Sequence, residues 1–139
     1  MINNRKARFD YTLLEEFSAG MVLVGTEVKS IRNGKASIAE AYCIVINGEV
    51  FVRNMTVEQY DDARLQHDVK RDRKLLLSKR EIQKISRALM DRGIALIPLF
   101  VKNEGRTIKM NISIAKGKKE YDKRETIKKR DVMRELQRA

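Results

Sequence analysis

TIKMNISI, from Thr107 to Ile114, decides the fold, because apolar and polar residues alternate along it without interruption. Strict alternation is typical of a β-strand that buries one face and exposes the other. The face expected in the core contains Ile108, Met110, Ile112 and Ile114, and the face expected in solvent contains Lys109, Asn111 and Ser113. A half-buried strand of this kind needs paired strands beside it.

The neighbouring strands are predicted to form hairpins. Asn47-Gly48, a dipeptide suited to the positive φ angles of a tight turn, separates the stretches AYCIVI (41–46) and EVFVRNM (49–55). A second hairpin is expected to turn at KNEG (102–105), which joins the apolar stretch IALIPLFV (94–101) to TIKMNISI. Further strands are predicted for RKLLL (73–77) and FSAGMVLV (17–24), whereas YTLLEEF (11–17) is ambiguous.

Two helices are indicated by the residues at their ends. Ser78 and Glu81 form an S-x-x-E capping box that opens one helix, and Gly93 is expected near its end. The buried stripe of this helix is expected to contain Ile82, Ile85 and Leu89. Residues 26–32 are predicted to form a shorter helix that ends at Asn33-Gly34 and buries Val28 and Ile31.

These elements add up to about six strands and two or three helices, joined by hairpin-type connections and not by alternating βα units. The predicted fold class is therefore mainly β with helices, an antiparallel barrel similar to the oligonucleotide-binding fold. A chain of 139 residues with 42% apolar content fits one compact domain and an appendage. Residues 1–115 are assigned to the barrel and residues 116–139 to a flexible basic tail.

Positive charge is in large excess. The chain contains 30 basic and 19 acidic residues, a net charge of +11. The last 24 residues alone hold ten basic and five acidic residues, a net charge of +5. A phosphate-rich partner is the first expectation for such an excess. Because the tail has too few apolar residues to pack on a core, we expect it to be disordered when free and helical when bound.

No catalytic or metal-binding constellation is apparent in the sequence. His67 is the single histidine, which excludes a metal site of several imidazoles, and it is expected in solvent or facing RNA. Asp61, Asp62 and Asp68 can in principle hold Mg²⁺ for a nuclease, although interspersed basic residues favour a solvated, mixed-charge loop. The lone Cys43 is expected in the core. No enzyme, metal or cofactor is therefore expected.

Neither end of the chain nor its apolar stretches indicate a membrane protein. No stretch approaches the roughly 20 apolar residues of a membrane span. The N-terminal stretch MINNRKARF is basic but lacks the apolar segment of a signal peptide. A soluble cytoplasmic protein is expected.

Five stretches form a pattern that is more specific than any single short motif. In order they are NRKARFDY (4–11), AGMVLVGTEVKSIRNGKASIAEAY (19–42), GEVFVRNM (48–55), RKLLLSKREI (73–82) and AKGKKEYDKRETIKKRD (115–131). Together they resemble the SmpB family, small protein B of bacterial trans-translation, over nearly the whole chain. The resemblance implies a binding adapter without catalysis, whose oligonucleotide-binding-like barrel holds the tRNA-like domain of tmRNA and whose tail enters the ribosome.

By this resemblance, the RNA-binding surface is expected to take residues from several parts of the barrel. They are Asn4, Arg5, Lys6, Gly20, Glu27, Lys29, Arg71, Arg73, Lys74 and Leu76. Structural roles are the alternative for some of them. Leu76 can be a core residue, and Glu27 and Lys29 can merely decorate a helix.

The chain departs from the usual pattern of the family at three positions. Ser18 stands where an acidic residue is common, Ser78 where His or Asn is common, and Val69 where Pro is usual. Polar contacts made at these positions in relatives therefore do not transfer directly, and Ser78 is expected to cap its helix.

The resemblance also implies a ribosome-engaging segment in the tail, which contains Lys116, Gly117, Lys118, Lys119, Tyr121, Asp122, Lys123 and Arg124. Lys and Arg can neutralise rRNA phosphates, and an aromatic ring can stack on an unpaired base. The alternative is a generic basic tail that tethers the chain to any RNA.

The implied partners are tmRNA, the ribosome with its small-subunit rRNA, and, through tmRNA, alanyl-tRNA synthetase and the GTP-bound elongation factor. The tail is expected to engage the empty decoding site and the mRNA path of a stalled ribosome. The alternative functions are a small ribosomal or assembly protein with a basic extension and an RNA-cleaving enzyme.

Overall fold

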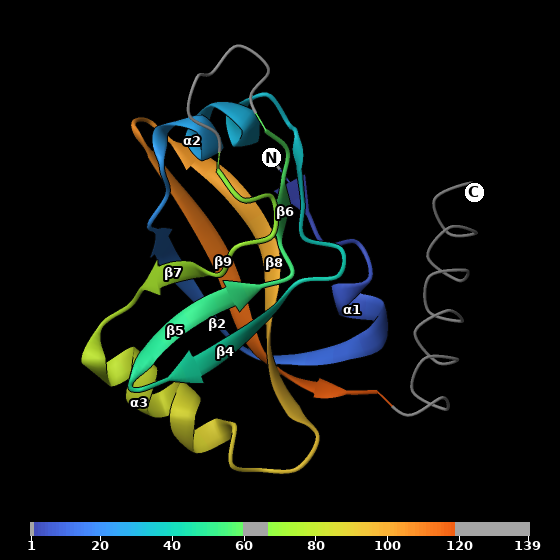
Figure 1. Ribbon diagram of the computed structural model, residues 1–139. Coiled ribbons are helices and arrows are strands. Elements are labelled where there is room, and N and C mark those ends of the chain that lie inside the picture. Colours follow the sequence, from blue (N-terminus) through green and yellow to red (C-terminus); the bar gives the residue numbers. More distant parts are fainter. Residues whose placement is uncertain (1, 60–66, 119–139) are drawn as a thin grey trace, which may run out of the picture.

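The computed structural model describes residues 2–59 and 67–118, and this part of the chain forms one large antiparallel sheet with three helices (Figure 1). The strands of the sheet are β1 (Ile2–Asn3), β2 (Tyr11–Met21), β4 (Tyr42–Ile46), β5 (Glu49–Arg53), β7 (Arg73–Leu76), β8 (Ile94–Glu104) and β9 (Thr107–Gly117). A separate pair is formed by β3 (Ala36–Ser37) and β6 (Thr56–Val57). The helices are α1 (Ala7–Asp10), α2 (Gly25–Arg32) and α3 (Lys79–Ala88).

The sheet closes on itself. Its strand order is β1-β8-β4-β5-β7-β2-β9, and β8 also pairs with β9, so that six strands form a ring and β1 is added at β8. Closure leaves few unpaired strand edges, which is the physical advantage of a barrel. The predicted fold class, an antiparallel barrel of about six strands with two or three helices, is confirmed.

The alternating stretch 107–114 lies in β9, and its apolar face is buried as predicted. The prediction of a solvent-exposed opposite face is wrong at Ser113, which is fully buried. At this end of the strand the outer face is covered too, because Ala7 of α1 packs there in a second apolar cluster with Ile97, Leu99 and Ala115. The Ser113 hydroxyl donates to the main-chain oxygen of Glu15, 2.9 Å away, so that its burial leaves no polar group unpaired.

Both predicted hairpins are present. Asn47 and Gly48 have φ angles of 51° and 73° and connect β4 to β5, as the dipeptide predicts. The β8–β9 hairpin is tighter than expected, because Glu104 pairs with Thr107 and leaves only Gly105 and Arg106 in the turn. The strand thus includes most of the KNEG stretch that was predicted to turn.

The two predicted helices are present as α3 and α2. At the start of α3, the Ser78 hydroxyl accepts from the Glu81 main-chain N–H at 3.2 Å, and Glu81 accepts from the Ser78 N–H at 2.9 Å. Ile85 is fully buried and anchors the helix on the core. α3 ends at Ala88, and Gly93 takes the positive φ angle of 77° in the turn that follows.

Some local predictions differ from the structure. The ambiguous stretch 11–17 is the first part of β2, a strand that ends at Met21 and not at residue 24. The short elements β1, α1, β3 and β6 were not predicted, because two to four residues are too few to show a hydrophobic period. Cys43 is buried in the core as expected.

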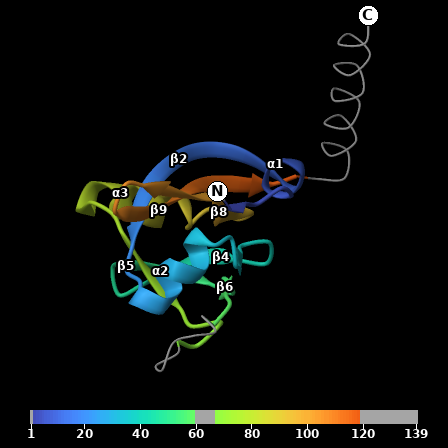
Figure 2. The ribbon, with the colours of Figure 1, turned by 90° about the horizontal axis from the view of Figure 1, so that it is seen from above.

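The two ends of β2 organise the molecule. α1 immediately precedes its first residue, and its last residues pair with β7, which leads into α3. Figure 2 shows α1 and α3 at the two ends of β2. Within residues 2–59 and 67–118, no helix has the length and apolar content needed to cross a bilayer.

Candidate nucleic-acid interface

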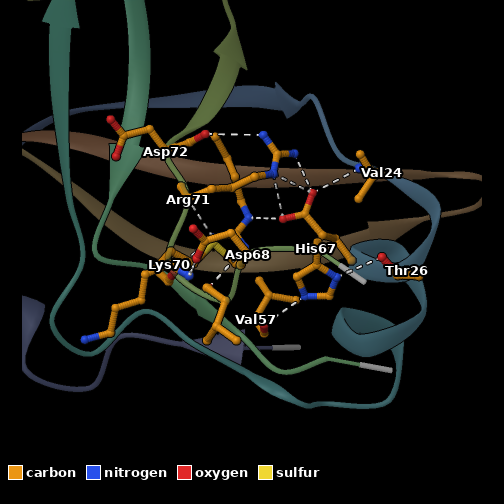
Figure 3. A network of polar contacts seen from close by, with 12 residues as sticks. Val24, Thr26, Val57, His67, Asp68, Lys70, Arg71 and Asp72 are labelled. Atoms are coloured by element: carbon orange, nitrogen blue, oxygen red, sulfur yellow. Dashed lines mark hydrogen bonds and ion pairs between the residues drawn. The ribbon is translucent and has the colours of Figure 1, made fainter. Parts of the chain in front are cut away.

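A buried carboxylate, Glu27, organises the polar network between α2 and β7. Figure 3 shows this network and labels Val24 and Arg71, which both donate to Glu27. Glu27 occupies the first turn of α2 and accepts the main-chain N–H of Val24 at 3.0 Å, which closes the start of the helix. The guanidinium groups of Arg71 and Arg73 both donate to it, from the segment that leads into β7. One carboxylate therefore joins α2 to the start of β7.

Arg73 lies inside the protein and not on its surface. Its side chain is fully buried, and its Nε donates to Glu27. Nη1 donates to the carbonyl oxygens of Met55 and Arg71 at 2.8 and 3.1 Å, and Nη2 to those of Asp68 and Val69, both at 3.2 Å. These contacts use all the N–H donors of a guanidinium group. Arg73 thus fixes the path of the backbone from residue 68 to residue 73.

The ionisation of Glu27 follows from these contacts. Burial by itself would raise the pKa of the Glu27 carboxyl, but hydrogen bonds from Arg71, from the Val24 N–H and from Arg73, together with the charge of Arg73, outweigh burial and lower it. The carboxylate therefore stays ionised and neutralises the enclosed arginine, as a buried cation requires.

His67, just before the segment that Arg73 holds, contacts Val57 and the helix α2. Its Nε2 lies 2.9 Å from the carbonyl oxygen of Val57, which can only accept, so Nε2 carries the proton. Nδ1 lies 2.8 Å from the Thr26 hydroxyl of α2. The prediction that His67 is exposed or faces RNA is wrong, because its side chain is buried and both ring nitrogens have protein partners. Figure 3 shows this ring between Thr26 and Val57.

The outer side of this scaffold carries charged groups. The Arg71 side chain is 32% exposed beside its contact with Glu27. Lys74 pairs with Glu49 at 3.1 Å, and both side chains are about half exposed. Arg53 pairs with Asp72 through two nitrogens, and this pair lowers the pKa of the Asp72 carboxyl. Exposed pairs of this kind exchange partners at little cost, so their cations remain available to phosphate.

Leu76 adds an apolar spot beside these charges. It is 54% exposed, so the alternative that it is a core residue is wrong. It pairs across the sheet with Gly20, and a Cβ placed on Gly20 would lie 3.5 Å from the Leu76 Cβ. The exposed Val22 follows on the same edge, where its main-chain N–H donates to the Lys74 carbonyl oxygen. Arg71, Lys74, Leu76 and Gly20 therefore share one surface along β7 and β2.

The N-terminal candidates lie in a different place. Asn4 fastens the chain to β8, because its N–H donates to the Leu99 oxygen at 2.8 Å and its side-chain amide to the Pro98 oxygen at 2.9 Å. Arg5 and Lys6 then project from the surface just before α1. Three strands of the sheet separate β1 from β7. The structure thus gives two groups of candidates, and Lys29 is exposed on α2.

The first residues assigned to the tail belong to the barrel wall. Lys116 and Gly117 are in β9, where they pair with Thr12 and Tyr11 of β2. Lys118 follows the strand and is the last described residue. The other tail candidates, Lys119, Tyr121, Asp122, Lys123 and Arg124, lie outside the described residues, as do Asp61 and Asp62. Among the described residues no group of three His, Cys, Asp or Glu side chains could hold a metal ion.

The burial of two residues of this site was not predicted from the sequence. Arg73 was expected on or near the RNA-binding face, and His67 in solvent or facing RNA, whereas both side chains are buried. A signal for the role of Glu27 was present, because Glu at the third position of a helix is a common partner for the N–H at its start. No local pattern indicates the partners of His67, which come from segments 10 and 41 residues away.

Comparison with known proteins agrees with the sequence resemblance. A family model described as SmpB protein matches residues 1–139. The chain is 49% identical to an SsrA-binding protein of Parabacteroides distasonis, with 99% of this chain and 92% of that protein covered. It is 46% identical to an SsrA-binding protein of Gloeobacter violaceus, with 100% and 92% covered.

A solved structure agrees in fold over most of the chain. It is described as "tmRNA-SmpB: a journey to the center of the bacterial ribosome" and superposes with a TM-score of 0.72 at 36% sequence identity. The match covers 86% of this chain and 85% of that one.

Proposed function

The chain belongs to the SmpB family, and on that basis we propose that it binds the tRNA-like domain of tmRNA and delivers it to stalled ribosomes for trans-translation. The observation that carries this proposal is the fold match, at 36% identity, to a chain described together with tmRNA and the bacterial ribosome. The excess of positive charge and the basic surface agree with an RNA partner.

The surface along β7 and β2 is the proposed main contact with tmRNA. Arg71 and Lys74 supply cations for phosphates, and Leu76 with the neighbouring Gly20 supplies an apolar spot for a base or a ribose. Glu27 and Arg73 act from inside as positioning residues, because their side chains are enclosed and touch Arg71 and its backbone. A second contact comes from Arg5 and Lys6, and Lys29 adds charge on α2.

The tail is proposed to act after tmRNA has bound. Tyr121 and the triplet Asp122, Lys123 and Arg124 would engage small-subunit rRNA in the empty decoding site, and the segment would continue as a helix along the mRNA path. Lys119 supplies a further cation. Alanyl-tRNA synthetase and the GTP-bound elongation factor would meet the chain through tmRNA, in the cytoplasm. The proposed role is that of a binding adapter that catalyses no reaction itself.

The test is to purify the full chain from cells and sequence the RNA that accompanies it. One dominant tmRNA species is expected, and its binding should resist an excess of tRNA. A ribosomal protein would instead bring rRNA, and no enrichment of tmRNA would contradict the proposal. Incubation of the complex with Mg²⁺ should leave the RNA intact, because the proposed role includes no cleavage.

Truncation separates the barrel from the tail. A chain that ends at Lys118 keeps β9 complete and should bind tmRNA with nearly unchanged affinity, while it no longer supports tagging. The cut belongs after Lys118 because removal of residues 116–118 would also shorten the β2–β9 pairing. If this truncation abolishes tmRNA binding, the assignment of binding to the barrel is wrong.

A further inference from the structure

Lys118 is held against α1 by two hydrogen bonds. Its main-chain N–H donates to the Asp10 oxygen at 2.9 Å, and its Nζ donates to the Arg8 oxygen, also at 2.9 Å. Both acceptors are carbonyl groups of α1, near the end where helical carbonyls lack partners within the helix. A lysine is well suited to this end because its charge favours exposed carbonyl oxygens.

The same helix continues directly from the N-terminal RNA-binding residues. Lys6 caps α1, and its carbonyl oxygen accepts from the N–H groups of Phe9 and Asp10. Asn4 holds the preceding segment on β8. α1 packs on the barrel through Ala7, which is 3% exposed. Lys118 is therefore hydrogen-bonded to α1, and the segment of Asn4, Arg5 and Lys6 leads directly into this helix.

Lys116 makes no comparable contact. It is exposed in β9, and its side chain has no partner among the described residues. The two lysines lie on either side of Gly117 and carry the same charge, but of the two only Lys118 donates from its side chain to α1. They therefore offer a comparison between a free cation and one that is held in place.

We propose that Lys118 is a positioning residue that clamps the root of the tail to α1, and so sets where residues 119–139 leave the barrel relative to the RNA held by the N-terminal segment. The inference rests on the proposed function. A tail that must reach a fixed place on the ribosome, while tmRNA occupies the barrel, depends on a defined point of departure. If Lys118 instead bound a phosphate, its ammonium group would first have to give up the hydrogen bond to the Arg8 carbonyl oxygen.

Two substitutions separate the clamp from a simple cation. Lys118→Gln and Lys116→Gln each remove one positive charge. We expect Lys118→Gln to slow the transfer of alanine from charged tmRNA to the nascent chain by about tenfold, within the usual range for coupling between two sites. Lys116→Gln removes the same charge without breaking a bond to α1, so it should slow the transfer clearly less than Lys118→Gln does. Binding of tmRNA should be equal for both variants and the unchanged chain.

A covalent bridge provides the decisive test. Arg8→Cys alone should leave tagging unchanged, because the clamp uses the main-chain oxygen of that residue. The double variant Arg8→Cys with Lys118→Cys should transfer alanine as slowly as Lys118→Gln does. Joining the two thiols with a short bis-maleimide should restore the rate of alanine transfer. The native Cys43 does not compete, because it is buried and burial raises the pKa of its thiol.

The outcomes distinguish the clamp from the function on which it rests. Equal effects of Lys118→Gln and Lys116→Gln, or efficient bridging without recovery of the rate, would overturn the clamp. Failure of the unchanged chain to bind tmRNA in the same assays would overturn the proposed function instead.

Discussion

Arg73 and Glu27 form an ion pair in which both side chains have no exposed surface. The two residues are 46 positions apart in the chain, and the pair joins the first turn of α2 to the first residue of β7. It lies directly beneath Arg71, the candidate for phosphate contact, which shares the same carboxylate. The surface proposed to contact RNA therefore rests on a buried charged network.

Removal of Glu27 should destabilise the protein strongly. Glu27→Gln leaves the buried Arg73 without its counter-charge, and the loss of one partner from such a pair costs about 3–5 kcal/mol in the free energy of unfolding. Urea denaturation of the variant and of the unchanged chain measures this change in the free energy of unfolding. The matched control is Glu49→Gln, whose exposed pair with Lys74 should contribute less than about 1 kcal/mol. Equal effects of the two changes would contradict the role assigned to the buried pair.

The same carboxylate predicts a pH dependence. Because the folded-state pKa of Glu27 is lowered from its ordinary value of 4.5, its stabilising contribution is fully present above about pH 4.5 and is lost as the pH falls through the lower folded value. The difference in unfolding free energy between the unchanged chain and Glu27→Gln should therefore shrink below pH 4.5. A difference that stays constant down to strongly acidic pH would show that Glu27 does not titrate with folding.

Arg5 and Lys6 should act as phosphate ligands that contribute little to the fold. Both are exposed, and neither side chain has a partner among the described residues. Changing both to Gln should weaken tmRNA binding and reduce its salt dependence by about 0.7 to 0.9 in slope for each lost contact. The control is Arg80→Gln with Arg87→Gln on α3, which removes the same charge elsewhere. If both double variants reduce the salt dependence of tmRNA binding by the same amount, the attraction is nonspecific.

Ser78 tests whether a departure from the family pattern has a structural role. Its hydroxyl accepts the Glu81 N–H at the start of α3, so Ser78→Ala should cost about 1 kcal/mol of stability. The thermal midpoint and tmRNA affinity are measured together. An unchanged midpoint with a large loss of affinity would make Ser78 an RNA contact.

The sequence predicted those features whose physical cause is local. The Asn47-Gly48 turn and the Ser78 capping box depend on residues within a few positions of each other, and both are present. Buried polar contacts are different, because the partners of Arg73 and His67 come from distant segments. In addition, a charged or polar residue is expected to be exposed unless a partner for it is known. Ser113 was misjudged for the same reason, since α1 covers a face that alternation assigns to solvent.

The order of residues in the tail should matter more than its charge. Replacement of Asp122, Lys123 and Arg124 by Ala removes two basic residues and one acidic residue, so the net charge falls by only 1. Electrostatic attraction to RNA scarcely changes, yet tagging should fail if these side chains engage the decoding site. The acid is informative, because a nonspecific phosphate clamp has no use for Asp122, whereas a folded tail can use it to cap a helix or contact a base.

The assay is alanine transfer from charged tmRNA to a nascent chain on a ribosome with a truncated message, measured beside tmRNA binding. The triple variant should bind tmRNA normally and transfer little alanine. Its control is a tail scrambled over residues 119–139 at constant composition, which keeps β9 and Lys118 intact and should fail in the same way. Normal transfer by either chain would reduce the tail to a generic basic tether, because only a tether tolerates the loss of residue order.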